Sequence, residues 1–237
     1  MVRRSKRYLQ LQEKLDPDKA YTPEEALALI KETGNAKFDE SVELHIRTGA
    51  DTRHADQLVR GVVILPHGLG KQTRVMVFAT GEAADIAKQA GADYIADDDM
   101  IKQIEGGWAE FEVGLAVPDV MSKIGRLGRV LGRRGLMPNP RTGTMVQPQD
   151  LPRAIEEAKQ GRLEYRMDRT AIIHTSVGKV SFSVEQLLVN MTTLADAVIK
   201  ARPAAIKGPF IKSAFLTTTM GPSILLDLPS LMALKPE

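Results

Sequence analysis

The pattern of apolar and polar positions in the first third of the chain predicts one helix followed by one half-buried strand. Thr22, Pro23 and Glu25 have the spacing of a capping box with proline at the first helical position, and apolar residues recur from there to Ile30. From residue 41 to residue 48 apolar and polar residues alternate strictly. Because successive strand side chains point to opposite faces, this segment is expected to bury one face and expose the other.

The middle of the chain has a different pattern, in which apolar runs alternate with helical segments. A short strand at residues 61–65 comes first, and the glycine-rich residues 66–70 follow it. Apolar runs at 75–79, 94–96 and 111–117 are then separated by two predicted helices, and a third helix is expected at 152–160. Such alternation is typical of an open parallel α/β layer.

Beyond Gly161 the pattern becomes antiparallel again. Strands are predicted at 163–168 and 171–177, then a long helix from Ser183 that opens with a second capping box, and finally a hairpin of 213–219 with 223–227. The strand at 41–48 cannot be stable alone, so it needs these later strands as partners. The prediction is a two-domain protein of the α/β and α+β classes.

In this arrangement a split α+β domain with an antiparallel sheet consists of residues 1–67 and 160–237, and residues 68–159 form an inserted α/β domain. Glycines at 68, 70 and 161 lie where the chain passes between the domains. They favour a hinge there and are equally consistent with ordinary turns.

The segment from Met121 to Asn139, called the glycine-arginine segment below, carries three stripes at helical spacing. The apolar stripe is Val120, Ile124, Leu127 and Leu131, the basic stripe is Arg126, Arg129 and Arg133, and the glycine stripe is Gly125, Gly128, Gly132 and Gly135. Each interior glycine costs a helix about 1 kcal/mol relative to alanine. The stripe therefore indicates either short broken helices or a backbone that something approaches closely, and we expect close packing within the inserted domain.

Composition narrows the function classes. The chain of 237 residues has a net charge of +2, no cysteine and no apolar window long enough to span a bilayer, which favours a soluble cytoplasmic protein without disulfides. Charge is concentrated locally. The N-terminus carries Arg3, Arg4, Lys6 and Arg7, and residues 120–149 contain Lys123, Arg126, Arg129, Arg133, Arg134 and Arg141 but no acidic residue. Such patches indicate a localised polyanion site, or else a solvated surface.

Catalytic and cofactor motifs are missing from the sequence. Gly68 and Gly70 lack the third glycine of a dinucleotide fingerprint, and Lys71 is not followed by the Ser or Thr of a P-loop. The four histidines have no metal-ligand spacing, and residues 97–99 form an aspartate run that favours a helix start over a divalent-ion site. We therefore predict a protein that is not an enzyme and has no cofactor. A nucleotide-dependent enzyme and a DNA-binding regulator stay as alternatives.

The split domain offers a better binding surface than the inserted one. Its polar strand faces and its C-terminal hairpin combine hydroxyls, carboxylates and exposed backbone, which can recognise ribose and base edges as well as phosphates. Phe38 is the one candidate for base stacking, with a place in the core as the alternative. The candidate RNA-binding residues are Lys37, Phe38, Ser41, Glu43, His45, Arg166, Asp168, Lys212, Ser213, Thr217, Thr219, Met220 and Gly221, with secondary contacts at Arg126, Arg129, Arg133 and Arg134.

Several long motifs resemble one known family. They are residues 37–43 (Lys-Phe-Asp-Glu-Ser-Val-Glu), 65–70 (Leu-Pro-His-Gly-Leu-Gly), 131–139 (Leu-Gly-Arg-Arg-Gly-Leu-Met-Pro-Asn) and 218–223 (Thr-Thr-Met-Gly-Pro-Ser). In this order, and over nearly the full length, the chain resembles the bacterial large-subunit ribosomal protein L1 family.

The resemblance implies a non-enzymatic RNA binder whose inserted domain is Rossmann-like and joined by a hinge. It implies that the main RNA surface lies on the split domain, at Lys37, Phe38, Ser41, Glu43, His45, Arg166, Asp168, Thr219, Met220 and Gly221. The implied partners are 23S rRNA at the mobile L1 stalk of the large ribosomal subunit, exit-site tRNA whose release the stalk assists, and the protein's own operon mRNA, whose translation it represses. The free protein is expected to be a monomer.

Overall fold

The computed structural model describes residues 4–235, so Arg3 of the basic N-terminus lies outside the described residues. The chain divides into two compact units. Unit 1 runs to Gly70 and resumes at Leu163, and unit 2 spans Lys71–Arg162. Unit 1 is therefore assembled from both ends of the chain, and unit 2 is continuous.

A four-stranded antiparallel sheet with the order β7-β1-β8-β9 forms the centre of unit 1. The strands are β1 (Ser41–Thr48), β7 (Ile172–Lys179), β8 (Ile211–Thr218) and β9 (Ile224–Leu225). The first strand has the predicted bounds, and its C-terminal partners confirm the antiparallel prediction. The predicted hairpin also forms, although β8 begins two residues earlier than predicted and β9 is shorter.

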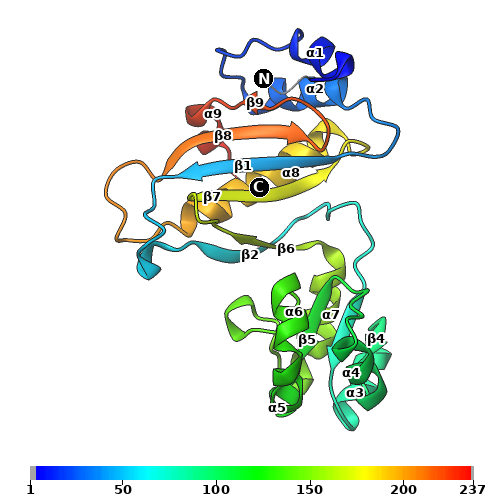
Figure 1. Ribbon diagram of the computed structural model, residues 1–237. Coiled ribbons are helices and arrows are strands. Elements are labelled where there is room, and N and C mark those ends of the chain that lie inside the picture. Colours follow the sequence, from blue (N-terminus) through cyan, green and yellow to red (C-terminus); the bar gives the residue numbers. More distant parts are fainter. Residues whose placement is uncertain (1–3, 236–237) are drawn as a thin grey trace. The chain divides into compact units, whose positions relative to one another are not determined.

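Two long helices cover one face of this sheet, and in Figure 1 no helix crosses β7 or β1 on the other face. The helices α2 (Pro23–Thr33) and α8 (Val184–Lys200) begin at the two predicted capping boxes. Both pack on the side where Val42, Leu44 and Ile46 point, and these three side chains are completely buried. Unit 1 also contains α1 (Lys6–Gln12), η1 (Ala55–Gln57) and α9 (Leu228–Ala233).

The remaining strands of unit 1 form a separate two-stranded sheet of β2 (Arg60–Ile64) and β6 (Arg162–Arg166). The predicted strand at 163–168 thus ends earlier than expected. Asp168 ends it, because its carboxylate accepts hydrogen bonds from the backbone N–H groups of Thr170 and Ile172, both at 2.8 Å. These bonds fold residues 168–172 into a turn that leads directly into β7. No helix of the described chain has both the length and the apolar character needed to cross a membrane.

Unit 2 is built on a three-stranded parallel sheet with the order β4-β3-β5, as the alternating pattern predicted. Its elements are β3 (Val75–Phe78), α3 (Glu82–Gln89), β4 (Tyr94–Ile95), α4 (Asp98–Glu105), β5 (Val113–Ala116), η4 (Pro140–Thr142), η5 (Pro148–Asp150) and α7 (Leu151–Gln160). Val75 and Val77 of the central strand face α3 and α7, whereas Met76 and Phe78 face a second core on the other side. Both faces of the sheet are therefore covered.

The glycine-arginine segment folds into short pieces instead of one helix. They are η2 (Pro118–Val120), α5 (Met121–Ile124), η3 (Gly125–Leu127) and α6 (Gly128–Arg134). The whole predicted apolar stripe is buried, but in two cores. Ile124, Leu127 and Leu131 enter the second core of unit 2, and Val120 enters the core on the side of α3 and α7.

The expectation that the glycines of this segment pack closely within the inserted domain is wrong. A Cβ atom added at Gly125, Gly128 or Gly132 would meet nothing within 4 Å, because the stripe faces outward. Gly135 has a φ of 73° and ends α6 in the left-handed conformation. The close approach in unit 2 occurs at Gly114 instead, where a Cβ would lie 2.8 Å from the carbonyl oxygen of Leu136.

Candidate nucleic-acid interface

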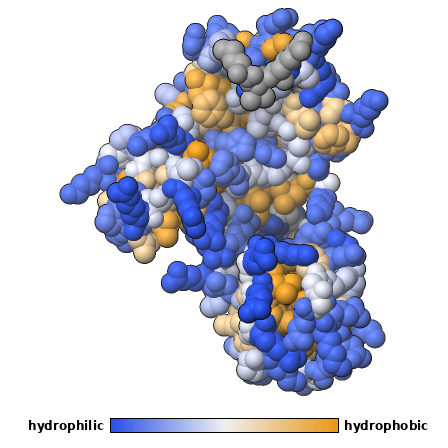
Figure 2. All heavy atoms as spheres, in the orientation of Figure 1, coloured by the Kyte–Doolittle hydropathy of each residue, from blue (hydrophilic) through white to orange (hydrophobic). Residues whose placement is uncertain are grey.

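The side of the four-stranded sheet opposite α2 and α8, called the open sheet face below, is lined mainly by polar side chains from three strands. Strand register places Ser41, Glu43, His45 and Arg47 of β1 opposite Lys179, Ser176, His174 and Ile172 of β7, and Glu43, His45 and Arg47 also opposite Thr217, Phe215 and Ser213 of β8. Directly opposed residues point to the same face of a sheet. Figure 2 shows that hydrophilic surface and hydrophobic patches alternate on this side.

One end of the open sheet face is bordered by two loops that a buried carboxylate ties together. Glu40 is only 1% exposed, and its two carboxylate oxygens accept hydrogen bonds from the backbone N–H groups of Ala36 and Met220, both at 2.9 Å. The first loop carries Lys37 and Phe38, and the second comprises residues 219–221. Glu40 therefore fixes two candidate binding segments that are far apart in the sequence.

Further contacts hold residues 219–221 from both sides. The Thr219 hydroxyl accepts a hydrogen bond from the Ser41 backbone N–H at 3.0 Å. The Arg7 guanidinium, from α1, donates to the carbonyl oxygen of Met220 at 2.8 Å and to the side chain of Asn35 at 2.6 Å. Gly221 lies so close to Thr218 that a Cβ there would be 2.3 Å from the Thr218 hydroxyl oxygen. This loop is thus ordered in the free protein.

The side chains at the rim of these loops are free to meet a ligand. Phe38 is 55% exposed and Met220 is 50% exposed. The alternative that Phe38 belongs to the core is therefore wrong. Lys37 is also exposed, and its ammonium has no partner among residues 4–235. An exposed aromatic ring and a free cation flank a fixed backbone, which is an arrangement that suits a base and its phosphate.

A row of two adjacent imidazole groups, with a carboxylate at each end, crosses the open sheet face. The Nδ1 atoms of His45 and His174 lie 2.9 Å apart, Glu43 lies 3.6 Å from His45 Nε2, and Asp168 lies 3.6 Å from His174 Nε2. Burial lowers the pKa of His45 below its ordinary value, and His174 lowers it further, against an opposing contribution from Glu43.

Asp168, at the end of this row, is held in its charged form. Burial acts to raise the pKa of Asp168, but hydrogen bonds from Ile172 and Thr170 outweigh it and bring that pKa below the ordinary value. The row therefore offers both hydrogen-bond donors and acceptors at neutral pH.

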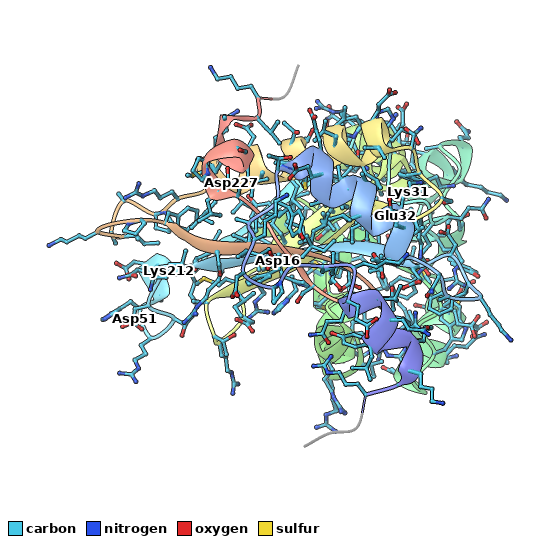
Figure 3. All side chains as sticks on the ribbon, turned by 90° about the horizontal axis from the view of Figure 1, so that it is seen from above. Asp16, Lys31, Glu32, Asp51, Lys212 and Asp227 are labelled. Atoms are coloured by element: carbon cyan, nitrogen blue, oxygen red, sulfur yellow. The ribbon has the colours of Figure 1, made fainter. Side chains whose placement is uncertain are left out.

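Three predicted site residues lie away from the centre of the open sheet face. Arg166 ends β6, and Asp168 follows in the turn before β7, so both border the row from its side. Lys212 lies near the start of β8, at the opposite end of the sheet from residues 219–221 (Figure 3). The pairing of β8 with β1 skips Lys212 at a register shift, and its side chain lies beside Gly49. The fold thus places the other predicted residues of unit 1 on the open sheet face or at its borders, and separates Lys212 from them.

In unit 2, some arginines of the glycine-arginine segment bond to other residues of the unit and others do not. Arg126 forms an ion pair with Glu105 at 2.8 Å, and Arg134 donates to the carbonyl oxygens of Gly107 and Ala109, both at 3.3 Å. Arg129 and Arg133 are exposed and have no partner within the described part of the chain. These two are the arginines available to an external anion.

The aspartate run of unit 2 is a helix start, as favoured from the sequence. Asp97 is the N-cap of α4, and its side chain accepts a hydrogen bond from the Met100 N–H at 2.8 Å. No group of three or more potential ligands arranged for a metal ion occurs between residues 4 and 235.

Sequence reasoning missed five residues that build the site. Glu40, Arg7, Lys179, Ser176 and His174 either lie on the open sheet face or hold its loops. The β7 residues could have been found, because a strand pairing with β1 must place its own polar side chains beside Glu43 and His45. Glu40 and Arg7 carried no such signal, since their partners are backbone groups distant in sequence.

Comparison with known proteins identifies the family. A model described as "Ribosomal protein L1p/L10e family" matches residues 29–222. A protein of Thermomicrobium roseum named large ribosomal subunit protein uL1 is 54% identical over 229 residues, covering 96% of this chain and 95% of its own. Proteins of the same name from Dehalococcoides mccartyi and Chloroflexus aggregans are 51% and 52% identical, and each covers 99% of this chain. Together with the motifs, these matches show that the chain belongs to the ribosomal protein L1p/L10e family, a family of ribosomal proteins and not of enzymes.

Proposed function

We propose that this chain is a structural component of the large ribosomal subunit that binds 23S rRNA through the open sheet face and residues 219–221. The observation that carries the proposal is the loop held by Glu40 and Arg7 beside a row of hydroxyl, carboxylate and imidazole groups. Such groups recognise ribose hydroxyls and base edges, which phosphate-binding lysines alone cannot do. The names of the relatives support the ribosomal assignment.

The finer roles belong to the same proposal. The protein acts in the cytoplasm at the mobile L1 stalk, assists release of exit-site tRNA, represses translation of its own operon mRNA through a similar RNA site, and is a monomer off the ribosome. The RNA-binding residues of unit 1 are Lys37, Phe38, Ser41, Glu43, His45, Arg166, Asp168, Ser213, Thr217, Thr219, Met220 and Gly221, with Lys212 as an outlying contact. Arg129 and Arg133 are the stronger secondary contacts, ahead of the internally bonded Arg126 and Arg134.

We also propose that unit 2 is a Rossmann-like domain inserted into a split one, with residues 68–159 and the pair 1–67 and 160–237 as separate folding domains. The order β4-β3-β5 supports a doubly wound layer, because the first strand lies between the second and the third, as in the flavodoxin-like strand order 2-1-3-4-5. Gly161 has a positive φ and caps α7, so it supports an ordinary helix end as readily as a hinge.

The test compares a transcript of the large-subunit stalk RNA with its DNA equivalent. The full chain should bind the RNA tightly and prefer it over the DNA by at least about 100-fold. Joined residues 1–67 and 160–237, checked for folding by circular dichroism, should keep most of this affinity. Equal affinity for RNA and DNA would favour a DNA-binding regulator, and loss of binding in the folded two-segment protein would move the main site to unit 2.

A further inference from the structure

Beside the open sheet face, unit 1 has a hollow of about 470 Å³. It forms where the loop before β2 meets the end of β6, and two hydrogen bonds join its walls. The backbone N–H of Met167 donates to the carbonyl oxygen of Val59 at 3.0 Å, and the Thr52 hydroxyl donates to the carbonyl oxygen of Arg169 at 2.9 Å. The hollow is therefore a formed feature of unit 1, within the size range of small-ligand pockets, roughly 300–1,000 Å³.

The lining of this hollow combines an apolar surface with free guanidinium groups. Val59 and Met167 are buried in its floor, and Leu58 is 49% exposed at its edge. Arg166 and Arg169 also line it, and within residues 4–235 neither guanidinium has a hydrogen-bond or ion-pair partner. An inorganic phosphate would use the arginines but not the apolar floor, whereas an aliphatic side chain would use the floor but not the arginines. A planar heterocycle next to a phosphate uses both.

The hollow is continuous with the open sheet face. Asp168 lines the hollow, and its carboxylate lies 3.6 Å from Nε2 of His174. His174 in turn contacts His45 in the middle of the sheet. An RNA strand that lies along the row of Glu43, His45 and His174 therefore reaches the hollow without leaving the protein surface.

We infer that this hollow is a socket for one unstacked nucleobase of the bound RNA, with Leu58, Val59 and Met167 against the base and Arg166 and Arg169 at its face and its phosphate. The inference rests on the proposed RNA-binding function and adds to it a place where a single base leaves the RNA stack. Sequence-specific RNA recognition commonly uses such extruded bases, because their faces and edges become accessible.

The experiment uses the full chain and a stalk RNA transcript, with base-specific chemical probing and measured affinities. Leu58→Glu places a charge against the base, and Val189→Glu is the matched control, because Val189 is similarly exposed at 41% but lies on α8, behind the sheet. Leu58→Glu should weaken binding about tenfold relative to the control and should expose one nucleotide that the wild type protects. If urea unfolding shows that Leu58→Glu is not folded, Leu58→Ala is used in its place.

A second arm identifies the base. An abasic nucleotide at the protected position should weaken binding to the wild type, and Leu58→Ala should add little further loss on that RNA, because the two changes remove one interaction. Equal affinities of the two glutamate variants, or additive losses in this cycle, would overturn the proposed base socket. The proposed RNA-binding function would still stand if the wild type binds the RNA in preference to the DNA. Failure of the wild type to prefer the RNA over its DNA equivalent would overturn both.

Discussion

The open sheet face of unit 1 and the glycine-arginine segment of unit 2 are both accessible and polar, but they hold their groups differently. On the sheet, strand pairing fixes Ser41, Glu43 and His45, and a buried carboxylate fixes the neighbouring loop. On the segment, charge is denser, yet two of its arginines bond within unit 2 and its glycines face open space.

The difference separates two ways of meeting a polyanion. A fixed array of donors and acceptors can select a particular RNA, because an unmatched ligand leaves buried polar groups unpaired. A mobile cationic surface attracts any phosphate backbone and depends strongly on salt. The most basic stretch of a chain is therefore a weak guide to its most selective surface.

The largest expected effect is that of Glu40→Ala in unit 1. The substitution leaves the N–H groups of Ala36 and Met220 without their acceptor and separates the two loops. We expect a loss of about 3 kcal/mol in unfolding free energy, measured by urea titration, because charge-assisted hydrogen bonds are lost inside the protein.

The RNA affinity of Glu40→Ala should also fall, since the loop of residues 219–221 is no longer held in place before RNA binds. Glu40→Gln, which keeps an oxygen acceptor, is the matched control and should lose less in both measurements. If Glu40→Ala bound stalk RNA as the wild type does while folded, order in the loop would not be what distinguishes the two surfaces.

Gly221→Ala has the next largest effect. The new Cβ would lie 2.3 Å from the Thr218 hydroxyl oxygen, which is buried and has no hydrogen-bond partner in the described chain. Thr218 must then move within a packed strand, so we expect a loss of about 1–3 kcal/mol in unfolding free energy. A thermal or urea transition unchanged from that of the wild type would show that this loop adapts freely.

Removing the free charges of the glycine-arginine segment should change the salt dependence of RNA binding and leave its selectivity intact. Arg129→Gln combined with Arg133→Gln should lower the slope of log affinity against log salt by about 1 to 2. The matched control is Arg126→Gln with Arg134→Gln, which removes the same charge from the internally bonded pair and should change the slope less. Equal slopes for the two double variants would contradict the distinction between free and engaged arginines.

Gly132→Ala should stabilise the protein, in contrast to Gly221→Ala. Gly132 lies inside α6, and a Cβ there meets no atom within 4 Å. Alanine favours a helix by about 0.5–1 kcal/mol over glycine, so the urea midpoint should rise. A weakened RNA affinity in this more stable variant would show that the glycine stripe serves close approach of a ligand.

The smallest effect concerns pH and His45. The pKa of His45 is lowered from 6.5 in the folded protein. Just below pH 6.5 the unfolded chain therefore binds a proton at His45 more readily than the folded chain does. Unfolding free energy must therefore decrease as the pH falls through 6.5 towards the folded value. His45→Gln should lose less stability than the wild type between about pH 7.5 and about pH 5.

Asp168 does not interfere in this pH range. Its pKa is lowered, so the stability it contributes is lost only as the pH falls below the ordinary carboxyl value of 3.8. A wild type and a His45→Gln variant with the same pH dependence of unfolding would show that His45 titrates normally in the folded protein.

Much of this molecule follows from local rules in the sequence. Strict alternation determined β1, two capping boxes determined the starts of α2 and α8, and the apolar stripe of the glycine-arginine segment determined which side chains enter the core. These features depend on backbone periodicity and on contacts within a few residues, which a sequence displays directly. The motifs also identified the family.

Only the tertiary structure decided how the candidate site is held. Glu40 meets Met220 across 180 positions, and Arg7 meets the same residue across 213, through backbone groups that carry no residue-specific signal. It also decided that Phe38 is exposed, that Lys212 lies apart, and that the glycine stripe faces outward. Periodicity tells which face of an element is apolar, but only packing tells which partners cover it and which polar groups remain free.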